Sequence, residues 1–429
     1  NRVRAPHLFG YVKEVDRTIR KNLNNKDLYE LGDLVGWSGL EKYYESFLMG
    51  MRGTYFYEVD ASGREVGSAS ELKDTRPSPG GNIQTTIDLN LQMYCEKLML
   101  NKKGVILVGQ PESGGILAAV SSPDYPPDFF TGLITESDWE NIKNNPDKPL
   151  MNRYLQGKYI PGSIVKMITQ VTLLNSEKFN KDLTQYCPGF YQFGDRIFGC
   201  WLSEGHGDLS LTEAISVSCD VFFYKTIKQI KLNDLHDSFK QFGFGLKTKI
   251  DIPNEATGLV PDKDYMVKRY GKYGWSKGVL LNLAIGQGEL LVTPIQVLNY
   301  VNLLATKGNS PSCHFVFVDN LPENVKPVLK NDIWNHIHKG LREAIVGENG
   351  TGKKANLDLD GFKLYGKTGT AENSHGDDHA WFVGWADYKN KKHSIVVLLE
   401  NAGSGGAVAA PMARKVFSEL ILKNELVLK

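Results

Sequence analysis

The sequence has no apolar run of about 18 or more residues, the length that a membrane-spanning helix needs. Its longest apolar runs, such as residues 395–399, are only as long as a strand. Positive and negative side chains nearly balance, with 50 Lys and Arg against 49 Asp and Glu, so no general attraction to nucleic acid is expected. The chain begins with Asn1 instead of Met, and we therefore expect a further segment to precede it.

Cysteine is scarce and odd in number, with five residues in 429. An odd count does not fit a disulfide framework. Hydrophobic residues make up 41% and charged residues 23%, the balance of an ordinary soluble globular protein. A chain of this length is expected to contain two or three domains.

The strongest linker signal is Arg-Pro-Ser-Pro-Gly-Gly at residues 76–81. Proline and glycine at this density interrupt both helices and strands. We therefore divide the chain into a non-catalytic module, residues 1–80, and a catalytic domain, residues 81–429.

Periodicity and turn residues predict an α+β fold. Strands are expected at 83–87, 105–108, 116–120, 363–371, 380–386 and 394–401, and helices at 90–100, 162–174, 211–229 and 408–422. Strands near both ends, with helices between them, indicate a sheet assembled from distant segments. The polar turn 387–392 predicts that its two flanking strands are antiparallel.

Ser163 and Lys166 lie in the run Tyr-Ile-Pro-Gly-Ser-Ile-Val-Lys. Three residues apart, they share one face of a helix. A serine becomes a nucleophile when a neighbouring base takes its proton, and a lysine can be that base. The spacing alone is common, and an ordinary helix start with a solvated lysine would explain it equally well.

Two further motifs favour catalysis. Ser218-Cys219-Asp220 and Lys367-Thr368-Gly369-Thr370 follow Ser163 at distances of 55 and 204 residues and supply further groups that acyl transfer by a serine needs. Such a reaction needs a base, a proton route to the leaving amine and donors for the oxyanion. The expected roles are Lys166 as base, Ser218 and Lys367 as proton relay, Thr368 and Thr370 as carboxylate ligands, Gly369 as a site of close substrate approach, and the N–H groups of Ser163 and Thr370 as oxyanion hole.

This series resembles the motif triplet of the penicillin-recognising serine transpeptidases and β-lactamases. The resemblance covers nearly the whole chain. Residues 31–45 are similar to the N-terminal pedestal module of class B penicillin-binding proteins, and residues 86–89, 282–288 and 405–411 are similar to further family segments. The resemblance implies the penicillin-binding transpeptidase fold, an antiparallel sheet flanked by helices, joined to a pedestal.

Asp220 stands where most of the superfamily has asparagine. Together with the pedestal segment, it resembles the cell-elongation group of class B penicillin-binding proteins, called penicillin-binding protein 2. An aspartate lacks the side-chain N–H of asparagine. If it is ionised, we expect it to pair with a lysine.

Cys187, Cys200, His206 and Cys219 lie within a short stretch of the chain. Three thiolates and one imidazole form a common structural zinc set. Buried free thiols, or one disulfide and a spare cysteine, remain alternatives. Some members of the elongation group have metal ligands at corresponding places. We expect a zinc ion that ties residues 187–206 to the catalytic motif.

The resemblance implies a D,D-transpeptidase that acylates Ser163 with a peptidoglycan stem peptide, releases the terminal D-Ala and forms a crosslink. β-Lactams would acylate the same serine. Expected partners are a membrane glycan polymerase and a rod-complex scaffold protein, but not nucleic acid. We expect a single-pass protein of the cytoplasmic membrane, anchored by a segment outside this chain, with its catalytic domain on the periplasmic face. Alternatives are a β-lactamase or D,D-carboxypeptidase, and a non-catalytic penicillin-binding sensor or scaffold.

Overall fold

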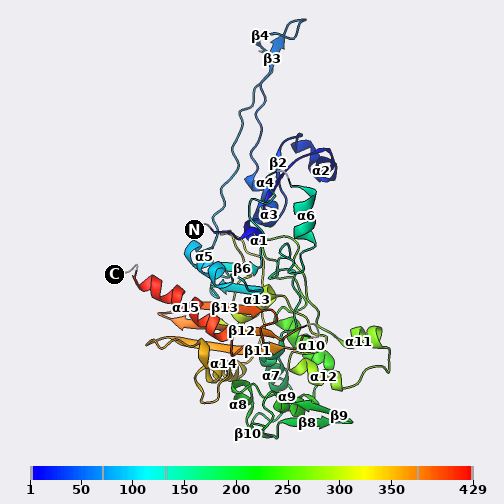
Figure 1. The fold of residues 1–429 in the computed structure, drawn as a ribbon, viewed down its shortest axis with the longest axis vertical. Coiled ribbons are helices and arrows are strands. Elements are labelled where there is room, and N and C mark those ends of the chain that lie inside the picture. The colour runs from blue at the N-terminus through cyan, green and yellow to red at the C-terminus, as the bar shows by residue number, and fades with distance from the viewer. Residues whose placement is uncertain (1–2, 70–71, 131, 133, 374–375, 427–429) are drawn as a thin grey trace.

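A five-stranded antiparallel sheet forms the centre of the larger part of the molecule (Figure 1). The computed structural model describes residues 3–69, 72–130, 132, 134–373 and 376–426. The strand order is β11-β12-β13-β5-β6. The strands are β5 (Gly104–Gly109), β6 (Ile116–Ser122), β11 (Lys363–Ala371), β12 (His379–Tyr388) and β13 (Lys391–Leu399). The α+β prediction is therefore confirmed, including the antiparallel pairing of β12 with β13.

Alternate residues of the sheet face two separate cores, as the period of a strand requires. Val105 and Leu107 pack into the core that contains helices α7 (Lys166–Leu174) and α13 (Pro294–Ala305). Ile106 and Val108 pack into the other core, beneath α5 (Leu89–Leu98) and α15 (Ala409–Leu426). The sheet is thus covered on both faces, and the central strand β5 is apolar along its length because both of its sides are buried.

The remaining helices are α6 (Glu136–Lys143), α8 (Leu211–Ser216), α9 (Asp220–Ile227), α10 (Leu232–Gln241), α11 (Lys263–Tyr270), α12 (Gly278–Ala284) and α14 (Asn331–Val346), with 3-10 turns η2 (Gly162–Val165) and η3 (Lys353–Ala355). Most of them lie on the α7 face or along the free edge of β11, but α6 lies near the N-terminal residues (Figure 1), and η3 packs against α15. Two small two-stranded antiparallel sheets, β7 (Gln185–Cys187) with β10 (Gly207–Leu209) and the hairpin β8 (Phe190–Phe193) with β9 (Arg196–Gly199), complete this region.

Two sequence predictions are wrong. Residues 211–229 do not form one helix, because the chain breaks between α8 and α9, where Ser218 has a φ of +58°. Residues 83–87 do not form a strand, and Thr85 makes only an isolated bridge to Val316. In both places tertiary contacts override the regular hydrogen-bonding pattern, helical or extended, that the local sequence predicts.

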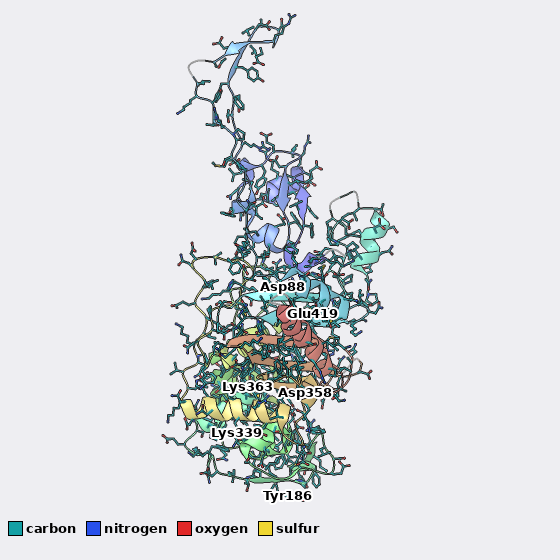
Figure 2. All side chains as sticks on the ribbon, turned by 90° about the vertical axis from the view of Figure 1, so that its left-hand side faces the viewer. Asp88, Tyr186, Lys339, Asp358, Lys363 and Glu419 are labelled. Atoms are coloured by element: carbon teal, nitrogen blue, oxygen red, sulfur yellow. The ribbon has the colours of Figure 1, made fainter. Side chains whose placement is uncertain are left out.

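The N-terminal residues form a narrow projection from this body (Figure 1). Its elements are α1 (Pro6–Phe9), β1 (Val12–Glu14), α2 (Arg17–Asn22), η1 (Lys26–Leu28), β2 (Leu34–Gly36), α3 (Gly39–Tyr43) and α4 (Glu45–Leu48), followed by the distal hairpin β3 (Tyr57–Val59) and β4 (Glu65–Ser68). Figure 2 shows Asp88 at the end of the body nearest to the projection and Tyr186 at the opposite end. Within the described ranges, no helix combines the length and apolar character needed to cross a membrane.

The projection is anchored by buried contacts. Leu8 and Leu40 belong to the main core of the body. The Tyr44 hydroxyl donates a hydrogen bond to Asp251 Oδ2 at 3.0 Å, and the same carboxylate accepts hydrogen bonds from the N–H groups of Phe315 and Val316. These contacts fix the base of the projection on the catalytic domain.

Candidate active site

Ser163 lies in the 3-10 turn η2, directly before α7, and lines a cleft of about 1220 Å³. Gly162 precedes it with a φ of +59°, and a Cβ at this position would lie 2.5 Å from the carbonyl oxygen of Thr370. Only glycine fits there, because any side chain would push the turn away from β11. The sequence Pro-Gly-Ser therefore allows the serine to sit against the edge strand.

Lys166 is completely buried one turn after Ser163. Its Nζ donates hydrogen bonds to Asp220 Oδ1 at 2.7 Å and to the Ser218 carbonyl oxygen at 2.8 Å, and it lies 3.3 Å from Ser218 Oγ. The lysine pairing expected for an ionised Asp220 is thus present in the structure. Because these partners satisfy the buried cation, Lys166 is held in one position beside the serine turn.

Lys367 approaches the same hydroxyl from β11. Its Nζ donates to Ser218 Oγ at 2.7 Å and to the Thr368 carbonyl oxygen at 3.0 Å. Burial lowers the pKa of Lys367 well below its ordinary value, and the nearby charge of Lys166 lowers it further. Ser218 therefore joins two lysines that come from different elements of the fold.

Ser218 can join them because of its strained backbone. A left-handed conformation is costly for a residue with a side chain, and it persists only where the surroundings enforce it. Here the Ser218 N–H bonds to the Ile215 carbonyl oxygen, and the Cys219 thiol caps α9 by accepting from the Phe222 N–H at 3.4 Å. The break between α8 and α9 turns the hydroxyl of Ser218 toward both amines.

The predicted residues of β11 lie along the other wall of the cleft. Thr368, Gly369 and Thr370 all line it. A Cβ on Gly369 would lie 2.8 Å from Ile164 Cγ2, so this glycine permits the close approach of η2. β11 is the edge strand of the sheet, so its outer side faces the cleft and not another strand.

Three residues of the site were not assigned by sequence reasoning. Thr351 accepts a hydrogen bond from Thr368 Oγ1 at 2.9 Å, and Gln287 donates to the Thr370 carbonyl oxygen at 3.2 Å. The Trp201 N–H donates to Asp220 Oδ2 at 3.1 Å, and its indole donates to the Val217 carbonyl oxygen at 2.9 Å. Only Gln287 had a signal, since it lies in the family-like segment 282–288.

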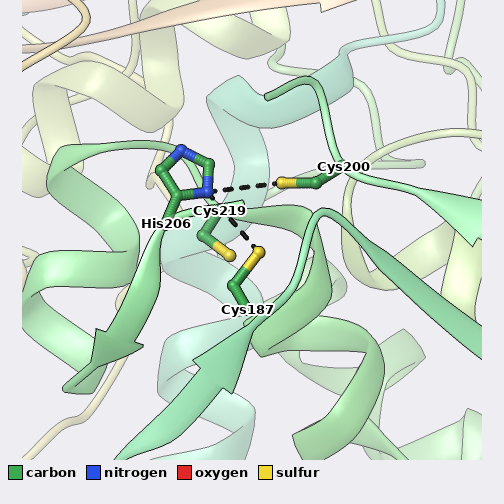
Figure 3. A group of neighbouring side chains, drawn as sticks. All are labelled: Cys187, Cys200, His206 and Cys219. Atoms are coloured by element: carbon green, nitrogen blue, oxygen red, sulfur yellow. Dashed lines mark hydrogen bonds between the residues drawn. The ribbon is translucent and has the colours of Figure 1, made fainter. Parts of the chain in front are cut away.

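The four candidate metal ligands converge next to the motif Ser218-Cys219-Asp220, which contributes one of them (Figure 3). All four ligand atoms lie within 4.8 Å of one another. His206 Nδ1 is 3.6 Å from Cys187 Sγ and 3.5 Å from Cys200 Sγ. Hydrogen bonds from Cys219 and His206 lower the pKa of the Cys200 thiol. The hydrogen bond between Cys219 and Cys200, together with burial, raises the pKa of the Cys219 thiol.

This cluster is connected to the candidate catalytic residues through the main chain. Cys219 separates Ser218 from Asp220, and Cys200 precedes Trp201, whose N–H binds Asp220. The four ligands come from β7, from the residues that follow β9, from the turn before β10 and from the cap of α9. A group that bound them would hold the segment 187–206 against the Lys166–Asp220 pair.

Comparisons with known proteins agree with this geometry. The family model described as penicillin binding protein transpeptidase domain matches residues 104–418, and the model described as penicillin-binding protein dimerisation domain matches residues 1–85. The peptidoglycan D,D-transpeptidase MrdA of Haemophilus influenzae is 33% identical over 96% of this chain and 67% of its own length.

Solved structures give the same result. Penicillin-binding protein 2 of Helicobacter pylori in complex with MreC is 32% identical, with a TM-score of 0.88 over 97% of this chain and 78% of that chain. A structure of a peptidoglycan synthase complex that coordinates polymerization and crosslinking is 29% identical, with a TM-score of 0.83 over 97% of this chain and 74% of that chain.

The chain belongs to the penicillin-binding protein transpeptidase family. Within that family, these relatives place it in the group of penicillin-binding protein 2.

Proposed function

We infer that this chain is a serine D,D-transpeptidase that crosslinks peptidoglycan stem peptides during cell elongation, and that β-lactams acylate its serine. The observation that carries the inference is the placement of Ser218 Oγ between Lys166 Nζ and Lys367 Nζ, in the cleft that Ser163 lines. Two amines on one hydroxyl provide a proton route next to a candidate nucleophile.

In the acylation step, Ser163 Oγ attacks the carbonyl carbon of the penultimate D-Ala. Lys166 acts as base in its neutral form, which is produced when its own proton passes to the paired Asp220 carboxylate, and takes the hydroxyl proton as the new C–O bond forms. The C–N bond to the terminal D-Ala then breaks, and the leaving amine receives its proton through Ser218. An amine from a second stem peptide later attacks the ester, restores the serine and forms the crosslink.

The β11 wall would bind and polarise the substrate. The N–H groups of Ser163 and Thr370 would stabilise the oxyanion, and the hydroxyls of Thr368 and Thr370 would bind the terminal carboxylate. The lowered pKa of Lys367 supports its role in the relay, because burial makes this amine give up a proton more readily than an ordinary lysine.

The donor set at Cys187, Cys200, His206 and Cys219 fits a structural zinc ion. Tetrahedral bonds of about 2.3 Å to sulfur and about 2.0 Å to nitrogen place S and N ligands about 3.5 Å apart. The distances from His206 Nδ1 to two of the sulfurs, 3.6 and 3.5 Å, are close to this value. Held by four protein ligands, an ion there would have a structural role and would hold the segment 187–206 in place.

Partners and location follow from the same function. The relatives were solved with MreC and in a synthase complex for polymerization and crosslinking, and we propose a scaffold protein and a membrane glycan polymerase as partners of this chain. The N-terminal projection, residues 1–80, is the proposed docking module. The site of action is the periplasmic face of the cytoplasmic membrane, where stem peptides are crosslinked.

A β-lactamase or D,D-carboxypeptidase would use the same residues but would resolve the acyl-enzyme with water. The lifetime of the penicilloyl enzyme separates these activities. We expect labelled penicillin to remain on the protein for many minutes, and donor and acceptor stem peptides to yield a crosslinked dimer. Release of the label within seconds, without dimer, would identify a hydrolase instead. Failure of labelling would favour a non-catalytic sensor.

A further inference from the structure

A second hollow, of about 490 Å³, opens beside the catalytic cleft. It lies between the hairpin β8–β9 and the segment that connects α11 to α12, and aromatic side chains form much of its wall, including Phe193, Tyr270 and Trp275. We call it the side groove. Its volume is in the range of a ligand pocket.

The side groove is continuous with the catalytic cleft. Four residues line both hollows: Arg196, Phe198, Asn282 and Gly288. Gly288 has a φ of +78° and carries no side chain to separate the two hollows. A peptide that lies in the catalytic cleft can therefore reach the side groove by passing over these four residues.

Arg196 stands at this junction with its guanidinium 4.9 Å from the centroid of the Phe198 ring. Phe198 is buried, so the stacked arginine rests on a fixed platform. In the part of the chain that the structure describes, Arg196 forms no ion pair. Because the guanidinium stacks through its face, its N–H donors stay free, and Arg196 can bind a carboxylate in a bidentate manner.

The opposite wall does not neutralise Arg196. Its one carboxylate, Glu289, accepts hydrogen bonds from the hydroxyls of Tyr265, at 3.3 Å, and Tyr270, and lies 3.5 Å from Arg269 Nε. Its charge is thus already paired within that wall. The second polar group at the junction is the carboxamide of Asn282, whose side chain forms no hydrogen bond among the described residues. An amide of this kind can pair with a peptide backbone.

On the basis of the proposed function, we propose that the side groove is a subsite for a stem peptide, in which Arg196 binds a carboxylate of the peptide at a distance from the reacting bond. Asn282 pairs with the peptide backbone, and the aromatic wall packs against its aliphatic parts. Arg196 is then a specificity-determining residue, since it distinguishes an acidic stem peptide from an amidated one.

The test uses two stem peptides that differ only in one α-carboxylate, free or amidated, each offered once as donor and once as acceptor. The wild-type chain is expected to prefer the free acid about tenfold in kcat/KM, the effect of one hydrogen-bonded charged group. Arg196→Gln should abolish this preference, whereas Arg196→Lys, which keeps the charge, should retain part of it. Arg17→Gln, an exposed arginine on α2, is the matched control and should keep the preference.

The position at which the preference appears identifies which stem peptide enters the side groove. A wild-type chain without a preference, or an Arg196→Gln variant that keeps it, would overturn the subsite. Labelling of the wild type by penicillin reports on the proposed function separately. If Ser163 is acylated but no preference is found, only the subsite is wrong, whereas absence of acylation refutes the proposed function itself.

Discussion

Lys166 and Asp220 form a buried ion pair in which Nζ and Oδ1 are 2.7 Å apart. The second oxygen of the same carboxylate accepts the N–H of Trp201. Asp220 thus uses both oxygens as acceptors, one for the catalytic lysine and one for the residue that follows a candidate metal ligand. This explains why an aspartate is suited to a position where asparagine is common in the superfamily.

Asp220→Asn is expected to destabilise the protein by about 1–3 kcal/mol, because an amide has only one oxygen and its NH₂ must face one of the two donors. Chemical unfolding of the variant and the wild type measures this difference. Asp208→Asn, on β10 and exposed, is the control. Equal stability of Asp220→Asn and the wild type would show that the two contacts are not both present in solution.

Lys367→Met is expected to abolish acylation by penicillin and to increase stability at pH 7 by about 1–3 kcal/mol. Burial lowers the pKa of the folded-state amine, so the unfolded chain binds a proton more readily and the wild type is weakened at neutral pH. Its stability should recover as the pH rises toward the ordinary lysine value of 10.5, where the unfolded chain also loses that proton.

Thermal unfolding of Lys367→Met and of the wild type across this pH range provides the measurement. The advantage of the methionine variant should shrink steadily as the pH rises. A variant that is less stable than the wild type at pH 7 would contradict the account, since Lys367 would then be stabilised in its charged form.

His7→Phe is expected to make the protein more resistant to acid. Burial lowers the pKa of His7 to about 4, from 6.5. As the pH falls from 6.5 to 4, the unfolded chain therefore gains a proton that the folded chain does not, and stability decreases by on the order of 3 kcal/mol. Phenylalanine keeps the edge contact with Tyr125, whose ring centroid lies 5.1 Å away.

Urea unfolding at pH 7 and pH 4.5 should show a smaller loss of stability for His7→Phe than for the wild type. His336→Phe, on α14, serves as the control and should lose as much stability as the wild type. An unchanged acid response in His7→Phe would mean that His7 is protonated, or exposed, in the folded protein.

The cysteine cluster is expected to bind one zinc ion per chain, measurable by elemental analysis. Cys187→Ser should lose the metal, lower the melting temperature and slow the acylation of Ser163, because the segment 187–206 would no longer hold Trp201 against Asp220. Cys95→Ser, a buried cysteine outside the cluster, should keep its zinc. A wild-type protein without zinc, whose folding is indifferent to chelators, would refute the site.

Much of the fold can be predicted from the sequence, because apolar runs and turn residues are local signals. Strands β12 and β13 have apolar runs with a polar turn between them, and the helix at 90–100 has clear periodicity. The break at Ser218 could not be predicted, because nothing in residues 211–229 interrupts the helical pattern. It arises from tertiary contacts that hold a non-glycine residue in the left-handed region.

The residues of the candidate site likewise fall into those that short motifs predict and those that only the tertiary structure reveals. Ser163, Lys166 and Lys367 could be found because their chemistry and spacing are encoded in short motifs. Trp201 and Thr351 could not, since their contacts with Asp220 and Thr368 are formed only when distant segments meet. The junction of the side groove at Arg196 is equally invisible in the sequence, where it is one exposed arginine in a short hairpin.

Intact-protein mass spectrometry after exposure to penicillin shows whether Ser163 is the acylated nucleophile. We expect a mass increase of one penicillin per chain, located by digestion to the peptide that contains Ser163 and absent from Ser163→Ala. An unmodified wild-type protein, or an adduct that persists in Ser163→Ala, would contradict it.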